Sequence, residues 1–116
     1  MRKREIIEEC KKNAPRFYDL VKDIKYEAKG IFNSELLFFC SIAKKFSVKL
    51  IIESGRANGQ STKILSNFFS APEYRIKSVE FQRYSSDVRR SFKILRGYSN
   101  LDLLFGNSFE IIPDLI

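Results

Sequence analysis

The segment from Lys49 to Thr62, KLIIESGRANGQST, limits the possible folds of this chain more than any other stretch. Its three consecutive apolar residues, 50–52, predict a short strand buried on both faces, because a strand with one face in water would alternate apolar and polar residues. The strand is followed by Glu53 and by a turn with glycines at 55 and 59. A buried strand that ends in a glycine turn and a helix is typical of α/β proteins with a parallel sheet.

The residues after this turn continue the same alternation. Apolar residues at helical spacing predict helices over 64–69 and 84–95, and apolar runs predict strands over 74–79 and 101–105. Strand, helix, strand, helix, strand indicates parallel strands joined by right-handed crossovers. We therefore expect an α/β fold over residues 48–116: a three-layer, Rossmann-like parallel sheet that is partial, with about three strands.

Residues 1–47 are expected to form amphipathic helices that precede the sheet. Positions 6–10 predict a first helix, Asn13-Ala14-Pro15 predicts a break, and positions 17–28 predict a second helix. Asn33 or Ser34 is expected to cap a third helix, and its many apolar residues predict that this helix is heavily buried.

The composition is that of a soluble globular protein. The chain has 116 residues, of which 44% are hydrophobic and 30% charged, and this fits a single domain able to bury a core. No apolar run approaches the roughly 20 residues needed to cross a bilayer, and the amino terminus has no apolar signal segment. We therefore expect no membrane association and a cytoplasmic location.

Cysteine and histidine content limits the chemistry. The two cysteines, Cys10 and Cys40, lack CxxC spacing, and the chain has no histidine to complete a metal site. We expect free, buried thiols and no bound metal. Without histidine, Ser-His and Cys-His nucleophilic catalysis are excluded within this chain.

The net charge of +7 lies mostly in the amino-terminal half. Residues 1–50 hold twelve Lys and Arg against seven Asp and Glu, and residues 51–116 hold nine against seven. Such an excess can attract nucleic acid. Because acidic residues are interleaved with the basic ones, a solvated surface on amphipathic helices explains it as well.

The glycine turn admits several ligands. A phosphate-binding P-loop needs GxxxxGK[ST], whereas here three residues separate the glycines and Gln60 stands in the lysine position. A dinucleotide site needs GxGxxG, and Ala57 replaces its second glycine. A nucleotide-sugar or dinucleotide enzyme remains a weaker alternative. Neither pattern accounts for the carboxylate of Glu53 at the end of the strand.

The sequence from Glu53 to Gly59, ESGRANG, resembles motif I of the class I S-adenosylmethionine-dependent methyltransferases, an apolar strand closing with an acidic residue and then GxGxG. The resemblance implies that Glu53 serves the amino group of the cofactor and that the turn lies under its methionine and ribose portions. Ala57 stands in place of the middle glycine. The start of the next helix, with the hydroxyl of Ser61, could hold a carboxylate.

Two further segments support this resemblance. Glu80 lies 21 residues beyond Gly59, where the family uses a carboxylate for the ribose hydroxyls, and the adjacent Phe81 could pack on the adenine. After the third expected strand, Gly106-Asn107-Ser108 resembles the GDS or GDA segment whose aspartate contacts the adenine amino group. The side-chain carbonyl of Asn107 can still accept from that amine.

The resemblance implies a methyltransferase, or its cofactor-binding half, that uses S-adenosylmethionine and a small-molecule or sugar acceptor. Residues 1–47 would then be a helical lid or packing segment, and 48–116 the first half of the cofactor-binding domain. No catalytic residue can be assigned. The alternative is a non-catalytic α/β binding module that binds nucleic acid through basic residues of the amino-terminal half: Lys3, Arg4, Lys11, Lys12, Arg16 and Lys22.

The resemblance covers about half of a class I sheet, whose strand order is 3-2-1-4-5. Residues 49–52 would form the first strand, and one of its edges would have no neighbour in this chain. We therefore expect either a truncated domain, whose missing carboxyl-terminal half completes the sheet, or a homodimer in which a second copy does so.

Overall fold

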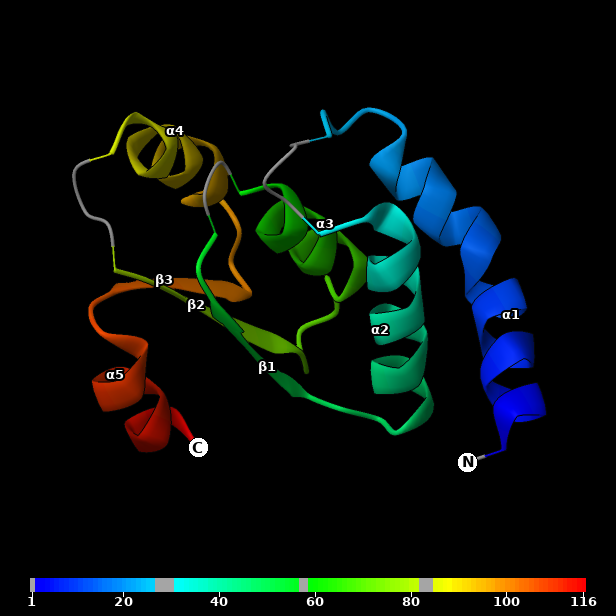
Figure 1. The fold of residues 1–116 in the computed structure, drawn as a ribbon. Coiled ribbons are helices and arrows are strands. Elements are labelled where there is room, and N and C mark those ends of the chain that lie inside the picture. Colours follow the sequence, from blue (N-terminus) through cyan, green and yellow to red (C-terminus); the bar gives the residue numbers. More distant parts are fainter. Residues whose placement is uncertain (1, 27–30, 57–58, 82–84) are drawn as a thin grey trace.

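The computed structural model describes residues 2–26, 31–56, 59–81 and 85–116 (Figure 1). Within these ranges no helix combines the length and the apolar character needed to span a membrane. The helices are α1 (Lys3–Val21), α2 (Asn33–Lys45), α3 (Gln60–Phe68), α4 (Ser86–Leu95) and α5 (Ser108–Leu115), and the strands are β1 (Leu50–Ser54), β2 (Arg75–Glu80) and β3 (Leu101–Phe105).

The sheet has the order β1-β2-β3, and both pairs of neighbouring strands are parallel. In register, Ile51 lies opposite Ile76, and Ile76 lies opposite Leu101. The α/β class, the three strands and their parallel pairing are confirmed. Among the described residues, β1 has a strand neighbour on one edge only.

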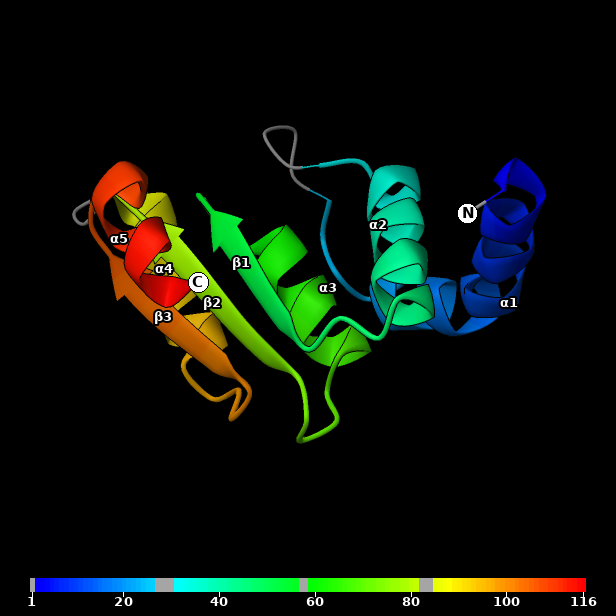
Figure 2. The ribbon, with the colours of Figure 1, turned by 90° about the horizontal axis from the view of Figure 1, so that it is seen from below.

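Helices cover the two faces of the sheet unequally. Helices α3 and α4 lie on one face, and α5 lies on the other (Figures 1 and 2). The main core forms where the sheet meets α3, and it includes Ile51, Ile64 and Ile76. Helices α1 and α2 extend this core through Phe17 and Leu36, so the amino-terminal helices and the sheet share one apolar interior.

The break predicted at Asn13-Ala14-Pro15 is wrong, because α1 runs through Pro15 without interruption. The helix ends at Val21, earlier than predicted, and the predicted end near Ala28 lies outside the described residues. Burial of Phe17 and Val21 on one face accounts for the continuity, since tertiary packing can outweigh the hydrogen bond that proline removes.

The predicted cap of α2 is wrong, because the helix already includes Asn33 and Ser34 and its N-cap is Phe32, which makes no side-chain cap bond. The helix is also less buried than predicted. Leu36, Leu37 and Cys40 are buried, whereas Phe38 and Phe39 are 49% and 44% exposed. Both cysteines are free thiols, but only Cys40 is buried as predicted, and Cys10 is partly exposed. Burial raises the pKa of Cys40 to about 12. The exposed ring of Phe39 lines a cavity beside the sheet.

Candidate functional site

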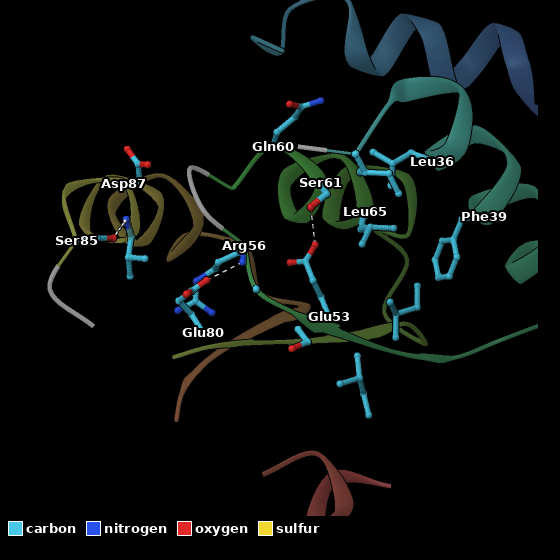
Figure 3. A pocket seen from close by; sticks show the side chains of 16 residues that line it. Leu36, Phe39, Glu53, Arg56, Gln60, Ser61, Leu65, Glu80, Ser85 and Asp87 are labelled. Atoms are coloured by element: carbon cyan, nitrogen blue, oxygen red, sulfur yellow. Dashed lines mark hydrogen bonds between the residues drawn. The ribbon is translucent and has the colours of Figure 1, made fainter. Parts of the chain in front are cut away.

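A cavity of about 740 Å³ lies at the carboxyl ends of β1 and β2, with side chains from α2, α3 and α4 around it (Figure 3). Open α/β sheets bind ligands at this end, and the volume is that of a small-molecule site. One part of the lining is apolar and includes Leu36, Phe39, Leu65 and Val88. The other part is polar and includes Glu53, Arg56, Gln60, Ser61, Glu80 and Asp87.

The two glycines of the turn have different functions. Gly55 lines the cavity with φ +82°, and a Cβ added there would meet no atom within 4 Å. A ligand could therefore lie against bare backbone at Gly55. Gly59, with φ +90°, precedes α3, and a Cβ there would come within 2.9 Å of Leu95 Cδ1. Gly59 thus permits α3 to pack closely on α4.

Glu53 lies at the cavity with its carboxylate turned toward the first turn of α3. Oε2 accepts a hydrogen bond of 2.5 Å from Ser61 Oγ, and Oε1 accepts from Thr62 Oγ1 and, at 2.8 Å, from Ser78 Oγ. A negative charge is favourable at the amino-terminal end of a helix. Glu53 therefore links β1, β2 and α3 at the cavity.

Glu80, at the end of β2, is the most buried carboxylate of the site. It is 8% exposed, and Oε2 accepts a hydrogen bond of 2.8 Å from the backbone N–H of Arg56. This bond connects the glycine turn after β1 to the end of β2 (Figure 3). It also orients a carboxylate at the cavity lining.

Arg56 is a site residue that the motif did not indicate, since its position in GxGxG is variable. The side chain is 3% exposed, and Nη1 donates to the carbonyl oxygens of Ser78, at 2.7 Å, and Leu104, at 3.3 Å. Burial lowers the pKa of Arg56, and the nearby charges of Glu80 and Glu53 partly oppose this shift. A buried cation therefore lies near two carboxylates at the carboxyl end of the sheet.

The structure brings four of the predicted cofactor residues to one cavity: Glu53, Gly55, Ser61 and Glu80. The lining does not include Phe81, which is 68% exposed. Ala57 lies outside the described residues.

Two predicted cofactor residues begin α5, on the other face of the sheet. The Asn107 side chain accepts a hydrogen bond of 2.9 Å from the Phe109 backbone N–H and so caps this helix. Ser108 Oγ lies 2.6 Å from Ser54 Oγ. Neither Asn107 nor Ser108 lines the cavity.

Solved structures that are similar to this chain include methyltransferases. The SAH-bound methyltransferase PaMTH1 of Podospora anserina has a TM-score of 0.59, 18% sequence identity, and matches over 97% of this chain. A Staphylococcus aureus protein described provisionally as a caffeoyl-CoA O-methyltransferase has a TM-score of 0.60, 14% identity and 90% coverage. The chain has a Rossmann-like methyltransferase fold.

This chain covers less than half the length of each of these structural neighbours. The chain spans 45% of PaMTH1, 47% of the S. aureus protein, and 47% of cofactor-bound Rv0187 from MTB, which has a TM-score of 0.59 and 15% identity. No family model matches the sequence, and no curated protein matches it significantly. The similarity therefore establishes the fold.

Proposed function

We propose that this chain is the S-adenosylmethionine-binding part of a methyltransferase. One observation carries the proposal: the bare backbone of Gly55 and the buried carboxylate of Glu80 line the same cavity at the carboxyl ends of adjacent parallel strands. The glycine leaves room for a ligand, and the carboxylate can accept hydrogen bonds from two neighbouring hydroxyls. A ribose-containing ligand meets both conditions.

The other residues of the cavity fit the same cofactor. Glu53 provides an anion that favours the ammonium of the methionine portion, although its oxygens also accept bonds from three hydroxyls. Apolar side chains such as Leu65 and Val88 suit the uncharged parts of the ligand. Ala57, Phe81, Asn107 and Ser108 stay proposed contacts that rest on the resemblance alone.

The proposed enzyme transfers a methyl group to a small-molecule or sugar acceptor. When bound, S-adenosylmethionine supplies an activated methyl group on its sulfonium. Methyl transfer to a reactive nucleophile requires alignment more than a base, so the lack of histidine is compatible with it. The ligand-bound state of PaMTH1, which has this fold, supports the choice of cofactor. A cytoplasmic location belongs to the same proposal.

Calorimetry with S-adenosylhomocysteine tests the proposal. The unmodified chain should bind, and Glu80→Ala should weaken binding at least tenfold, the loss expected for hydrogen bonds to a charged group. Gly55→Ala should weaken it as well, because the new methyl group enters the ligand space. Gly97→Ala controls for the added methyl group, since a Cβ at Gly97 also meets no atom within 4 Å but Gly97 lies outside the cavity lining. The φ of +82° strains an alanine at Gly55, so the fold of Gly55→Ala is checked by circular dichroism.

Lack of binding at millimolar S-adenosylhomocysteine would refute the proposal and favour the nucleic-acid alternative. If the chain also retains oligonucleotides, and this retention decreases as the salt concentration rises, the nucleic-acid alternative is supported. Two members of the basic set already have protein partners: Arg16 donates to the carbonyl oxygen of Phe68, and Lys22 pairs with Asp19. These contacts reduce the cationic surface available to a polyanion.

A further inference from the structure

Arg56 uses only part of its hydrogen-bonding capacity, although its side chain is buried. Nη1 bonds to two backbone carbonyl oxygens, but Nε and Nη2 have no hydrogen-bond partner among the described residues. A buried donor without an acceptor is unfavourable, and more so on a cation. Arg56 is a lining residue of the cavity, so a ligand bound there can supply the missing acceptors once the side chain turns toward it.

The two unpartnered nitrogens form one edge of the guanidinium plane. Nε–H and the adjacent Nη2–H are parallel donors, and such a fork binds two neighbouring oxygen atoms at once. The Phe105 ring, whose centroid is 4.8 Å from Arg56 Cζ, packs against the plane of the guanidinium. The group that satisfies this edge therefore carries two adjacent oxygens, as a carboxylate, a phosphate or a vicinal diol does.

The charges around Arg56 favour one of these three groups. Glu80 and Glu53 both act electrostatically on Arg56, so two acidic side chains stand against one guanidinium. The acidic side chains would repel an additional carboxylate or phosphate. A vicinal diol is neutral, and each hydroxyl can accept a hydrogen bond from the guanidinium while donating one to a carboxylate.

We propose that Arg56 and Glu80 bind the two hydroxyls of a ribose together, Arg56 as the donor and Glu80 as the acceptor. This inference rests on the proposed function and makes Arg56 a specificity-determining residue for ribose over deoxyribose. A site built to hydrogen-bond a hydroxyl rejects analogues that lack it, because its buried polar groups are then left unpaired.

Binding in this proposal requires the guanidinium to turn, and its new bonds to the diol then replace those of Nη1 to the carbonyl oxygens of Ser78 and Leu104. Nε and Nη2 are buried from solvent, so the diol reaches them when the Arg56 side chain turns toward the cavity. The backbone N–H of Arg56 already holds Glu80 Oε2 at 2.8 Å. Glu80 can therefore stay in place while the guanidinium moves.

Calorimetry on the full chain tests the pair with S-adenosylhomocysteine and its 2′-deoxyribose analogue. The unmodified chain should prefer the ribose form by about tenfold or more. Arg56→Met should weaken binding of the ribose form by about tenfold and remove most of the preference. Arg75→Met is the control, because Arg75 is exposed and pairs with Asp102 at the opposite end of β2.

A second variant and a second measurement keep the proposal testable if Arg56→Met does not fold. Arg56→Lys keeps the charge but loses the fork, so it should fold and show the same loss of ribose preference. In the unmodified chain, the NMR signal of Arg56 Nε–H should shift on addition of S-adenosylhomocysteine and much less with the deoxy analogue.

The outcomes distinguish the two proposals. If the unmodified chain binds S-adenosylhomocysteine and folded Arg56 variants keep both its affinity and the ribose preference, the role of Arg56 is refuted and the cofactor proposal stands. Tighter binding of adenosine 2′-phosphate than of adenosine would assign the fork to an anion and refute the diol. No binding of S-adenosylhomocysteine by the unmodified chain would overturn both.

Discussion

At the scale of single residues, Glu53 determines how the glycine turn is held. Its carboxylate accepts hydrogen bonds from Ser61, Thr62 and Ser78, on two other elements. We predict that Glu53→Ala lowers the free energy of unfolding by about 2–3 kcal/mol, because bonds to a charged acceptor are lost. Urea denaturation measures the change. Glu73→Ala, at an exposed position, should change stability by less than about 0.5 kcal/mol, and an equal loss there would argue against a specific role of Glu53.

A second residue, Cys40, predicts a pH dependence. Burial raises the pKa of its thiol to about 12 from an ordinary value of 9.0, so the folded state binds the proton more tightly than the unfolded state. The contribution is complete below about pH 9 and is lost as the pH rises toward 12. The stability advantage of the unmodified chain over Cys40→Ala should therefore shrink above pH 9, by up to about 1.4 kcal/mol per pH unit. A constant difference in urea unfolding from pH 8 to 10.5 would contradict this, and Cys10→Ala is the control.

At the scale of elements, helix α1 retains a proline that weakens it. Pro15 is exposed and lies inside the helix, where it cannot donate to the carbonyl of Lys11. Pro15→Ala should therefore raise the free energy of unfolding by about 1–3 kcal/mol. Thermal unfolding followed by circular dichroism measures this, with the exposed Lys12→Ala as a near-neutral control. A lower melting temperature would mean that the helix needs the proline ring.

At the scale of the whole molecule, strand β1 and α5 leave apolar surface exposed. Among the described residues, β1 pairs on one edge only, and Leu50, Phe109 and Ile116 are 40%, 92% and 91% exposed. Unpaired apolar edges favour association, so we predict concentration-dependent dimers or larger species in sedimentation velocity. Leu50→Lys should shift the chain toward monomer, whereas Phe46→Lys, exposed at the end of α2, should not. A well-ordered monomer of the unmodified chain at about 100 μM would rule this out.

The sheet could be predicted from the sequence because its signals are local. Each strand is a short apolar run, and the segments between strands have a helical period, so the order of elements follows without knowledge of tertiary contacts. The prediction of a helix break at Pro15 was wrong because the continuity of α1 depends on contacts that are not local. Burial of Phe17 against other helices outweighs the local preference of proline, and no local pattern reports that burial.

By itself, the sequence determined the fold class, the parallel order of the strands, and that Gly55 and Glu80 would meet at one end of the sheet. These follow from periodicity and from the rule that parallel strands place their carboxyl ends together. Only the tertiary structure decided which side chains share the cavity. It turned Asn107 to cap α5, used Gly59 for helix packing, and buried Arg56 with two unpartnered donors. The direction of a side chain depends on contacts with distant residues, which sequence spacing does not encode.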